Sequence, residues 1–259
     1  MITIRNNSAG YDKEATILRQ FRYAHRGLHD LSQGIPENSL AAFRRAVGRG
    51  FGAELDVHLL ADNSLAVFHE SDLQRMTGRE GVIEELTAAE LADYRLGGTE
   101  ETIPQLYQVL ELFDRAKLPL VVELKSYKNN PDALAARTVE ELDKYGAPYV
   151  MESFDPRCLL WLRKNRPEII RGQLAMDFIH GEHSGMGEKI DRLLTHMAFN
   201  RFTKPNFVAF RFEDRETPSL RRVKRTHSAV VFNWTIRSRE DMELAEAEGA
   251  QVIFEGFVP

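Results

Sequence analysis

Three carboxylates in short apolar runs have a spacing that suits metal binding. Glu54 and Asp56 lie two residues apart in one predicted strand, so their side chains point to the same side, and Glu123 lies near the end of a later strand. Converging carboxylates would repel one another, because burying unpaired charges costs free energy. A divalent cation removes this conflict, and an all-oxygen ligand set suits Mg²⁺ or Ca²⁺. The alternative is simple ion pairing with Arg26 and Lys125, but the set on neighbouring strands favours a metal.

Two histidines, His25 and His69, end two other predicted strands. Histidine suits general acid–base catalysis, because its ordinary pKa lies near neutral pH. The alternatives are a structural role or zinc ligation, but neither a cysteine cluster nor a His-Glu-x-x-His motif accompanies the pair. The two histidines therefore predict an acid and a base beside one reacting centre.

Arg26 and Lys125 place two cations beside the predicted metal site. Together they predict an anionic ligand, and phosphate matches the fork of an arginine side chain. The sequence contains neither a Gly-x-x-x-x-Gly-Lys-Ser/Thr loop nor a Gly-x-Ser-x-Gly motif, which argues against a nucleotide triphosphatase and a serine hydrolase. The basic run at 221–225 is typical of a solvated helix face in an acidic protein, and we predict no nucleic-acid partner.

The elements that must position these residues are short strands that alternate with helices. We predict strands at 23–25, 53–57, 65–69, 120–124, 149–153, 170–174, 207–210, 230–234 and 252–255. Helical patterns cover 39–47, 132–145 and 239–248. Such alternation predicts βαβ units around a parallel sheet.

The connection at 61–64 is too short for a parallel crossover, so the second and third strands should form a hairpin. Eight strands then remain, the number in an α/β TIM (β/α)8 barrel, whose chemistry lies at the carboxyl ends of the strands. Residues 70 to about 104, with a short helix at 87–94, predict a small insertion over one end of the barrel. Residues 180–206 are expected to be irregular. We therefore predict one barrel domain over residues 1–259.

The composition is that of an ordinary globular protein, with 43% hydrophobic and 28% charged residues in 259. The single cysteine, Cys158, cannot form an internal disulfide, which fits a reducing compartment. No apolar run is long enough to span a membrane, and residues 1–7 have no signal-peptide pattern, so we expect a cytoplasmic protein. A net charge of −5 argues against broad nucleic-acid binding. The sequence does not indicate an oligomeric state.

The ordered motifs resemble those of the glycerophosphodiester phosphodiesterases. The matching segments are His25-Arg26-Gly27, Pro36-Glu37-Asn38-Ser39, Ala42-Phe43, Glu54-Leu55-Asp56-Val57, His69, Leu73-x-Arg75-Met76-Thr77-Gly78, Ile103-Pro104-x-Leu106, Glu123-Leu124-Lys125, Ser153-Phe154 and Trp234-Thr235. The resemblance runs from about residue 22 to the end of the chain and is thin between 180 and 206. It implies a TIM barrel that uses a divalent metal to hydrolyse glycerophosphodiesters to glycerol phosphate and an alcohol. A cyclic phosphate is the expected intermediate.

The resemblance also implies a role for each matching residue. Carried over by motif, Glu54, Asp56 and Glu123 would bind the metal, and His25 and His69 would be the acid–base pair. Arg26 and Lys125 would bind the phosphate. Glu37 and Asn38 would shape the mouth of the site, and Trp234 would pack against the glycerol. We assign His25 as the base and His69 as the acid, although the sequence does not separate these roles. Two alternatives stay open: a lyase that stops at the cyclic phosphate, and a non-catalytic barrel that binds a phosphoryl ligand.

Some positions depart from the family pattern. Glu70 stands where the family usually has Asp after the second histidine, and Asp62-Asn63 replaces an Asp-Gly turn. Near the end of the chain, Glu255 stands in place of a common Asp and is a candidate for a further metal ligand. Glu152 is an extra carboxylate before Ser153, and we predict either a metal ligand or an ion-pair partner there.

Overall fold

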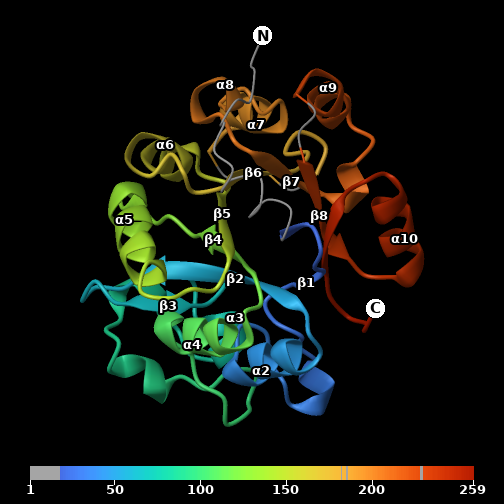
Figure 1. Cartoon of the computed structure of the whole chain (residues 1–259). Coiled ribbons are helices and arrows are strands. Elements are labelled where there is room, and N and C mark those ends of the chain that lie inside the picture. Colours follow the sequence, from blue (N-terminus) through green and yellow to red (C-terminus); the bar gives the residue numbers. More distant parts are fainter. Residues whose placement is uncertain (1–17, 182, 185, 228–229) are drawn as a thin grey trace.

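Eight parallel strands close into a barrel surrounded by helices (Figure 1). The computed structural model describes residues 18–181, 183–184, 186–227 and 230–259. The strands run in the order β1-β9-β8-β7-β6-β5-β4-β2, and β1 pairs with β2 to close the ring. Their bounds are β1 (Tyr23–Ala24), β2 (Gly52–Leu59), β4 (Leu120–Leu124), β5 (Tyr149–Ser153), β6 (Arg171–Ala175), β7 (Phe207–Arg211), β8 (Val230–Ile236) and β9 (Gln251–Phe254). The predicted (β/α)8 barrel is confirmed.

The predicted hairpin is also present. The third strand, β3 (Leu65–Val67), pairs antiparallel with β2 and stands outside the barrel. In the connecting turn, Asn63 adopts a φ of 64°, a left-handed conformation that asparagine tolerates. Asparagine therefore fills the position that glycine takes in the family pattern.

The outer layer consists of helices that follow the strands (Figure 1). They are α2 (Leu40–Gly48), α4 (Leu106–Ala116), α5 (Pro131–Leu142), α6 (Pro156–Asn165), α7 (Glu188–Thr195), α8 (Asn200–Thr203), α9 (Pro218–His227) and α10 (Arg239–Ala247). The expectation of an irregular segment at 180–206 is wrong, because α7 and α8 form within it. An apolar pair four residues apart, Ile190 and Leu194, packs this stretch against the barrel. None of the described helices is both long and apolar enough to cross a bilayer. Residues 1–7, on which the signal-peptide expectation rests, lie outside the described part of the chain.

The segment between β3 and α4 has a small apolar core of its own. It contains α3 (Gln74–Thr77) and two short 3₁₀ turns at Ile83–Glu85 and Glu90–Asp93. The second turn replaces the longer helix that we predicted at 87–94. Leu73, Ile83 and Leu96 are fully buried within this segment. The insertion is therefore an ordered structure that can hold side chains at the barrel mouth.

The alternation of side chains along the strands divides the barrel interior into two parts. Tyr23, Val121, Val150 and Ile253 belong to one buried apolar cluster, together with Phe207 and other residues from the remaining strands. Residues two positions further along a strand point to the same side. The apolar cluster thus fills the lower part of the barrel, and the polar residues that follow it lie at the carboxyl ends of the strands.

Candidate active site

The acidic residues form a row across three neighbouring strands. In the strand register, Asp56 of β2 pairs with Glu123 of β4, and Glu123 pairs with Glu152 of β5. Glu54 lies one step lower on β2, opposite Val121. Ligand oxygens of Glu54, Asp56 and Glu123 lie within 4.8 Å of one another, and Glu152 falls outside this spacing. The structure therefore brings together the three residues that the sequence selected.

Burial and mutual repulsion perturb these acids strongly. Burial, followed by the charges of neighbouring carboxylates, raises the pKa of both Glu54 and Glu152 well above the ordinary value. Burial also raises the pKa of Glu123, against the opposing effect of Lys125. Burial disfavours the ionised form of Asp56 as well, but His69 and Lys125 outweigh it and the pKa of Asp56 is lowered. In the protein without a cation, these shifts favour proton binding to Glu54, Glu123 and Glu152.

Two side-chain cations lie next to the acidic row. The Nζ of Lys125 lies 3.1 Å from Glu123 Oε1 and 3.6 Å from Asp56 Oδ1, and the Nε of Arg26 lies 3.6 Å from Asp56 Oδ2. The ion pairing that we considered as an alternative is therefore present in part. If Glu54, Asp56, Glu123 and Glu152 were all ionised, their charge would exceed that of Arg26 and Lys125 by two units. That excess equals the charge of one divalent cation.

Local donors hold the acids and their neighbours in place. The backbone N–H of Arg26 donates to Glu54 Oε2 at 3.0 Å, from a residue with a left-handed φ of 53°. Asn38 Nδ2 donates to Asp56 Oδ2 at 2.9 Å, and Arg26 Nη1 donates to Glu37 Oε1 at 2.8 Å. Glu37 and Asn38, which we predicted to shape the mouth, thus orient one cation and one acid of the site.

His25 is largely buried in the site, and its Nδ1 contacts a carboxylate. Its Nδ1 is 2.5 Å from Glu255 Oε2, and its Nε2 is 3.9 Å from Glu54 Oε2. Burial, and then the charge of Arg26, lower the pKa of His25 to about 4 in spite of Glu255. The ring is therefore neutral at pH 7, with Nδ1–H donating to Glu255 and Nε2 able to accept a proton. Glu255, a candidate metal ligand in the sequence, lies against His25 and outside the acidic group within 4.8 Å.

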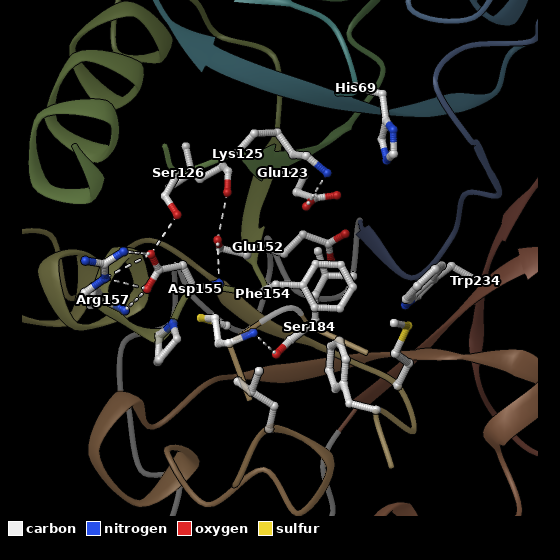
Figure 2. Close-up of a pocket in the computed structure, with 18 of the residues that line it drawn as sticks. His69, Glu123, Lys125, Ser126, Glu152, Phe154, Asp155, Arg157, Ser184 and Trp234 are labelled. Atoms are coloured by element: carbon white, nitrogen blue, oxygen red, sulfur yellow. Dashed lines mark hydrogen bonds and ion pairs between the residues drawn. The ribbon is translucent and has the colours of Figure 1, made fainter. Parts of the chain in front are cut away.

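His69 also has its Nδ1 against a carboxylate. Its Nδ1 lies 2.9 Å from Glu70 Oε1, and Figure 2 shows its ring directed toward Glu123 and Lys125. Burial opposes ionisation of Glu70, but hydrogen bonds from His69 and Arg75 lower its pKa to about 2. Glu70 is thus an ionised partner that fixes the ring of His69.

A cavity of about 1010 Å³ extends from these groups and has one apolar side. Figure 2 shows the polar ends of Glu123, Lys125 and Glu152 gathered near the rings of Phe154 and Trp234. The two rings meet edge to face, with centroids 5.8 Å apart, and the buried Trp234 Nε1 has no hydrogen-bond partner among the described residues. The apolar wall continues through Met176, Phe178, Ile190, Leu194 and Phe199. The cavity can therefore take a ligand with one charged and one apolar part.

The sequence did not draw attention to two residues near the site. His58 is buried, with Nδ1 2.7 Å from Glu84 Oε1 and Nε2 3.2 Å from the backbone oxygen of His69. Arg75 of α3 contacts both Glu70 and Glu37. For His58, alternation along β2 with Glu54 and Asp56 was an available signal. For Arg75, only its place in a segment that matches the family pattern pointed to a role.

A parallel barrel with acidic residues, two histidines and two cations at its carboxyl-terminal mouth is the architecture of a barrel enzyme for an anionic substrate. The model of the glycerophosphoryl diester phosphodiesterase family matches residues 25–258. The chain belongs to this family and is an enzyme of the glycerophosphodiester phosphodiesterase class.

Individual relatives agree with this membership. A glycerophosphodiester phosphodiesterase of Caldanaerobacter subterraneus subsp. tengcongensis is 30% identical over 229 residues, which cover 85% of this chain and 87% of the relative. One from Bacillus altitudinis is 33% identical over 168 residues, covering 61% and 67%. The fold is similar to that of an Oleispira antarctica phosphodiesterase solved with the product sn-glycerol-3-phosphate, with a TM-score of 0.73, 24% identity and coverage of 91% and 92%.

Proposed function

We propose that the chain hydrolyses glycerophosphodiesters with a divalent cation and two histidines, through a cyclic phosphate. The observation that carries this proposal is the pair of histidine–carboxylate contacts beside one acidic row. Each histidine has its Nδ1 against a carboxylate, which leaves Nε2 free to exchange a proton with substrate. Two such rings at one anion-binding mouth suit a displacement at phosphorus with a proton taken on one side and given on the other.

The residues present fit a divalent cation. The donor set is all oxygen, and the buried Asp56 Oδ1 has no hydrogen-bond partner within the part of the chain that the structure describes. Glu54, Asp56 and Glu123 would hold Mg²⁺ or Ca²⁺. When bound, the cation would supply Lewis-acid polarisation of the phosphoryl group and a lower pKa for the glycerol 2-hydroxyl.

The two histidines divide the proton transfers. His25 is neutral at pH 7, so its Nε2 accepts the proton of the glycerol 2-hydroxyl as that oxygen attacks phosphorus. His69, whose Nδ1 is held by Glu70, gives a proton from Nε2 to the departing alcohol oxygen. The cyclic phosphate is opened by water, which loses a proton to His69 as the 2-oxygen regains one from His25. Arg26 and Lys125 stabilise the charge on the phosphoryl oxygens, and Trp234 packs against the glycerol.

Phosphorus NMR of the reaction products tests this proposal. The protein is incubated with Mg²⁺ or Ca²⁺ and, separately, with glycerophosphocholine, glycerophosphoethanolamine and glycerophosphoglycerol. Glycerol phosphate is the expected final product. A cyclic phosphate that persists would instead identify a lyase. Absence of turnover with all three substrates and with a 1-acyl glycerophosphocholine, in the presence of either ion, would refute hydrolysis.

The apolar side of the cavity favours a second, narrower function, the hydrolysis of glycerophosphodiesters that carry an acyl chain. Seven apolar or aromatic side chains form this wall, from Phe154 to Trp234, whereas a choline or glycerol substituent needs little apolar surface. Each buried methylene contributes about 0.8 kcal/mol, or about fourfold in kcat/KM. We therefore expect lysophospholipids to be better substrates than their deacylated counterparts.

A chain-length series measures this preference. With 1-acyl glycerophosphocholines below their micellar concentrations, kcat/KM should rise with each methylene until the wall is covered. Ile190→Asn on the cavity side of α7 should reduce the ratio of acylated to deacylated turnover. Leu193→Asn, on the exposed side of the same helix, is the matched control. A ratio that does not depend on chain length would exclude the narrower function.

A further inference from the structure

Arg75 lies between two carboxylates at the mouth of the barrel. Its Nε and Nη2 donate to Glu70 Oε1 and Oε2 at 2.6 and 2.7 Å. Its Nη2 and Nη1 also donate to Glu37 Oε1 and Oε2 at 2.6 and 3.1 Å. One guanidinium therefore contacts both oxygens of two carboxylates, an arrangement that fixes the planes of all three groups.

Each of these carboxylates also contacts a different functional residue of the site. Glu70 Oε1 accepts from Nδ1 of His69 at 2.9 Å, and Glu37 Oε1 accepts from Nη1 of Arg26 at 2.8 Å. Arg75 is thus linked through Glu70 to the proposed proton donor, His69. It is linked through Glu37 to the proposed phosphate-binding cation, Arg26. Neither Glu70 nor Glu37 makes this link without it.

We propose that Arg75 is a positioning residue that holds His69 and Arg26 in a fixed relation to each other, and that the insertion carries α3 to the mouth for this purpose. The inference rests on the proposed function of these two residues. A lysine cannot take this role, because an ammonium group lacks the planar fork that engages two carboxylates at once.

Two simpler roles for Arg75 fit its contacts less well. A simple surface ion pair of a half-exposed arginine contributes little to stability, but Glu37 is largely buried and both pairs are bidentate. A second cation could also be held by Glu37, His69 and Glu70, whose ligand atoms lie within 4.8 Å of one another, with Arg75 merely adjacent. The Arg75 guanidinium already supplies the positive charge between these two carboxylates.

Chemical rescue tests the proposal. Arg75→Ala should fold, since the side chain is 46% exposed, and should lose about 10- to 100-fold in kcat. Millimolar methylguanidinium should recover much of this loss, whereas methylammonium at the same ionic strength should not. Arg75→Lys should remain as impaired as Arg75→Ala. The matched control is Arg79→Ala, an exposed arginine of the same insertion that contacts Asp93 and Tyr94; neither its activity nor its response to methylguanidinium should differ from the wild type.

The outcomes separate this inference from the proposed function. Wild-type turnover by Arg75→Ala or Arg75→Lys, or recovery with methylammonium as effective as with methylguanidinium, would overturn the positioning role. If the wild type hydrolyses no glycerophosphodiester, the proposed function fails, and the ring of His69 still reports on Arg75. Its Nδ1–H signal in ¹⁵N-edited NMR should exchange faster with solvent in Arg75→Ala and slow again with methylguanidinium. An unchanged signal would overturn the inference independently of activity.

Discussion

Replacement of Glu54 by glutamine should separate metal binding from folding. Burial and three neighbouring acids raise the pKa of Glu54 well above the ordinary value, which favours the protonated form of this group in the metal-free protein. Glutamine has nearly the shape of the protonated acid. We therefore expect metal-free Glu54→Gln to unfold at a temperature close to that of the metal-free wild type, and to lose the response to Mg²⁺ or Ca²⁺.

The geometry of the site explains why a cation is stabilising, and the concentration of the ion relative to its Kd sets the size of the response. Ligand oxygens of Glu54, Asp56 and Glu123 lie within 4.8 Å of one another, so two ionised members of the group repel by about 3 kcal/mol at an effective dielectric constant near 20. A cation at 100 times its Kd stabilises the folded state by about 2.7 kcal/mol. For a chain of this size, that corresponds to an increase in Tm of about 5–10 °C.

Calorimetry after EDTA treatment, with and without added Mg²⁺ or Ca²⁺, measures the Tm of each metal-free protein and the rise in Tm that the ion causes. The pH adds a check with a defined sign. A carboxyl whose pKa is raised in the folded state stabilises the metal-free protein below its unfolded pKa, and this stabilisation is lost as pH rises through the folded pKa. The metal-induced rise in Tm should therefore grow with pH, because the ion competes with protons. Equal rises for the wild type and Glu54→Gln, or none for either, would refute the metal site.

Three further results are expected. His25→Ala and His69→Ala should each lose at least about 100-fold in kcat, and near-normal turnover by either variant would remove the two-histidine mechanism. Thorough chelation should abolish turnover, and Mg²⁺ or Ca²⁺ should restore it; activity that survives chelation would contradict a metal-dependent reaction. Glu70 has its pKa lowered to about 2, so its stabilisation is present above its unfolded pKa of about 4.3 and is lost as pH falls through 2. Urea unfolding should show that Glu70→Gln is less stable at pH 7 by at most about 3 kcal/mol, reduced by solvent screening; a difference that persists at pH 2 would contradict this origin.

The barrel and the acidic group were accessible from sequence because both follow from periodicity. Alternation along a strand places Glu54 and Asp56 on one side, and parallel pairing brings Glu123 beside them. The short connection at 61–64 was enough to remove β3 from the barrel. Helices α7 and α8 were missed because polar residues and glycines dominate their surroundings. Ile190 and Leu194 show their apolar spacing only when the barrel surface beneath them is known.

The contacts of loop side chains had no comparable signal. Arg75 reaches Glu37 across 38 positions of sequence and Glu70 across five, with no repeating pattern to relate them. A long charged side chain in a turn can reach several partners, and the packing of the whole insertion selects among them. The same is true of His58, whose partner Glu84 is carried by a 3₁₀ turn of that insertion.

The contact between His25 and Glu255 lies between these two cases, because it is distant in sequence yet follows from the barrel itself. A closed barrel requires the first strand to pair with the last, and β1 does pair with β9, with Tyr23 opposite Ile253. His25 and Glu255 each stand two residues beyond this pair, on the side that faces the barrel interior. Closure and alternation together therefore bring the carboxylate to the histidine. A strand count that predicts a barrel therefore also predicts that Glu255 lies beside His25, provided that the register of the closing strand pair is known. In this chain, the Glu255 carboxylate then orients His25, the proposed base.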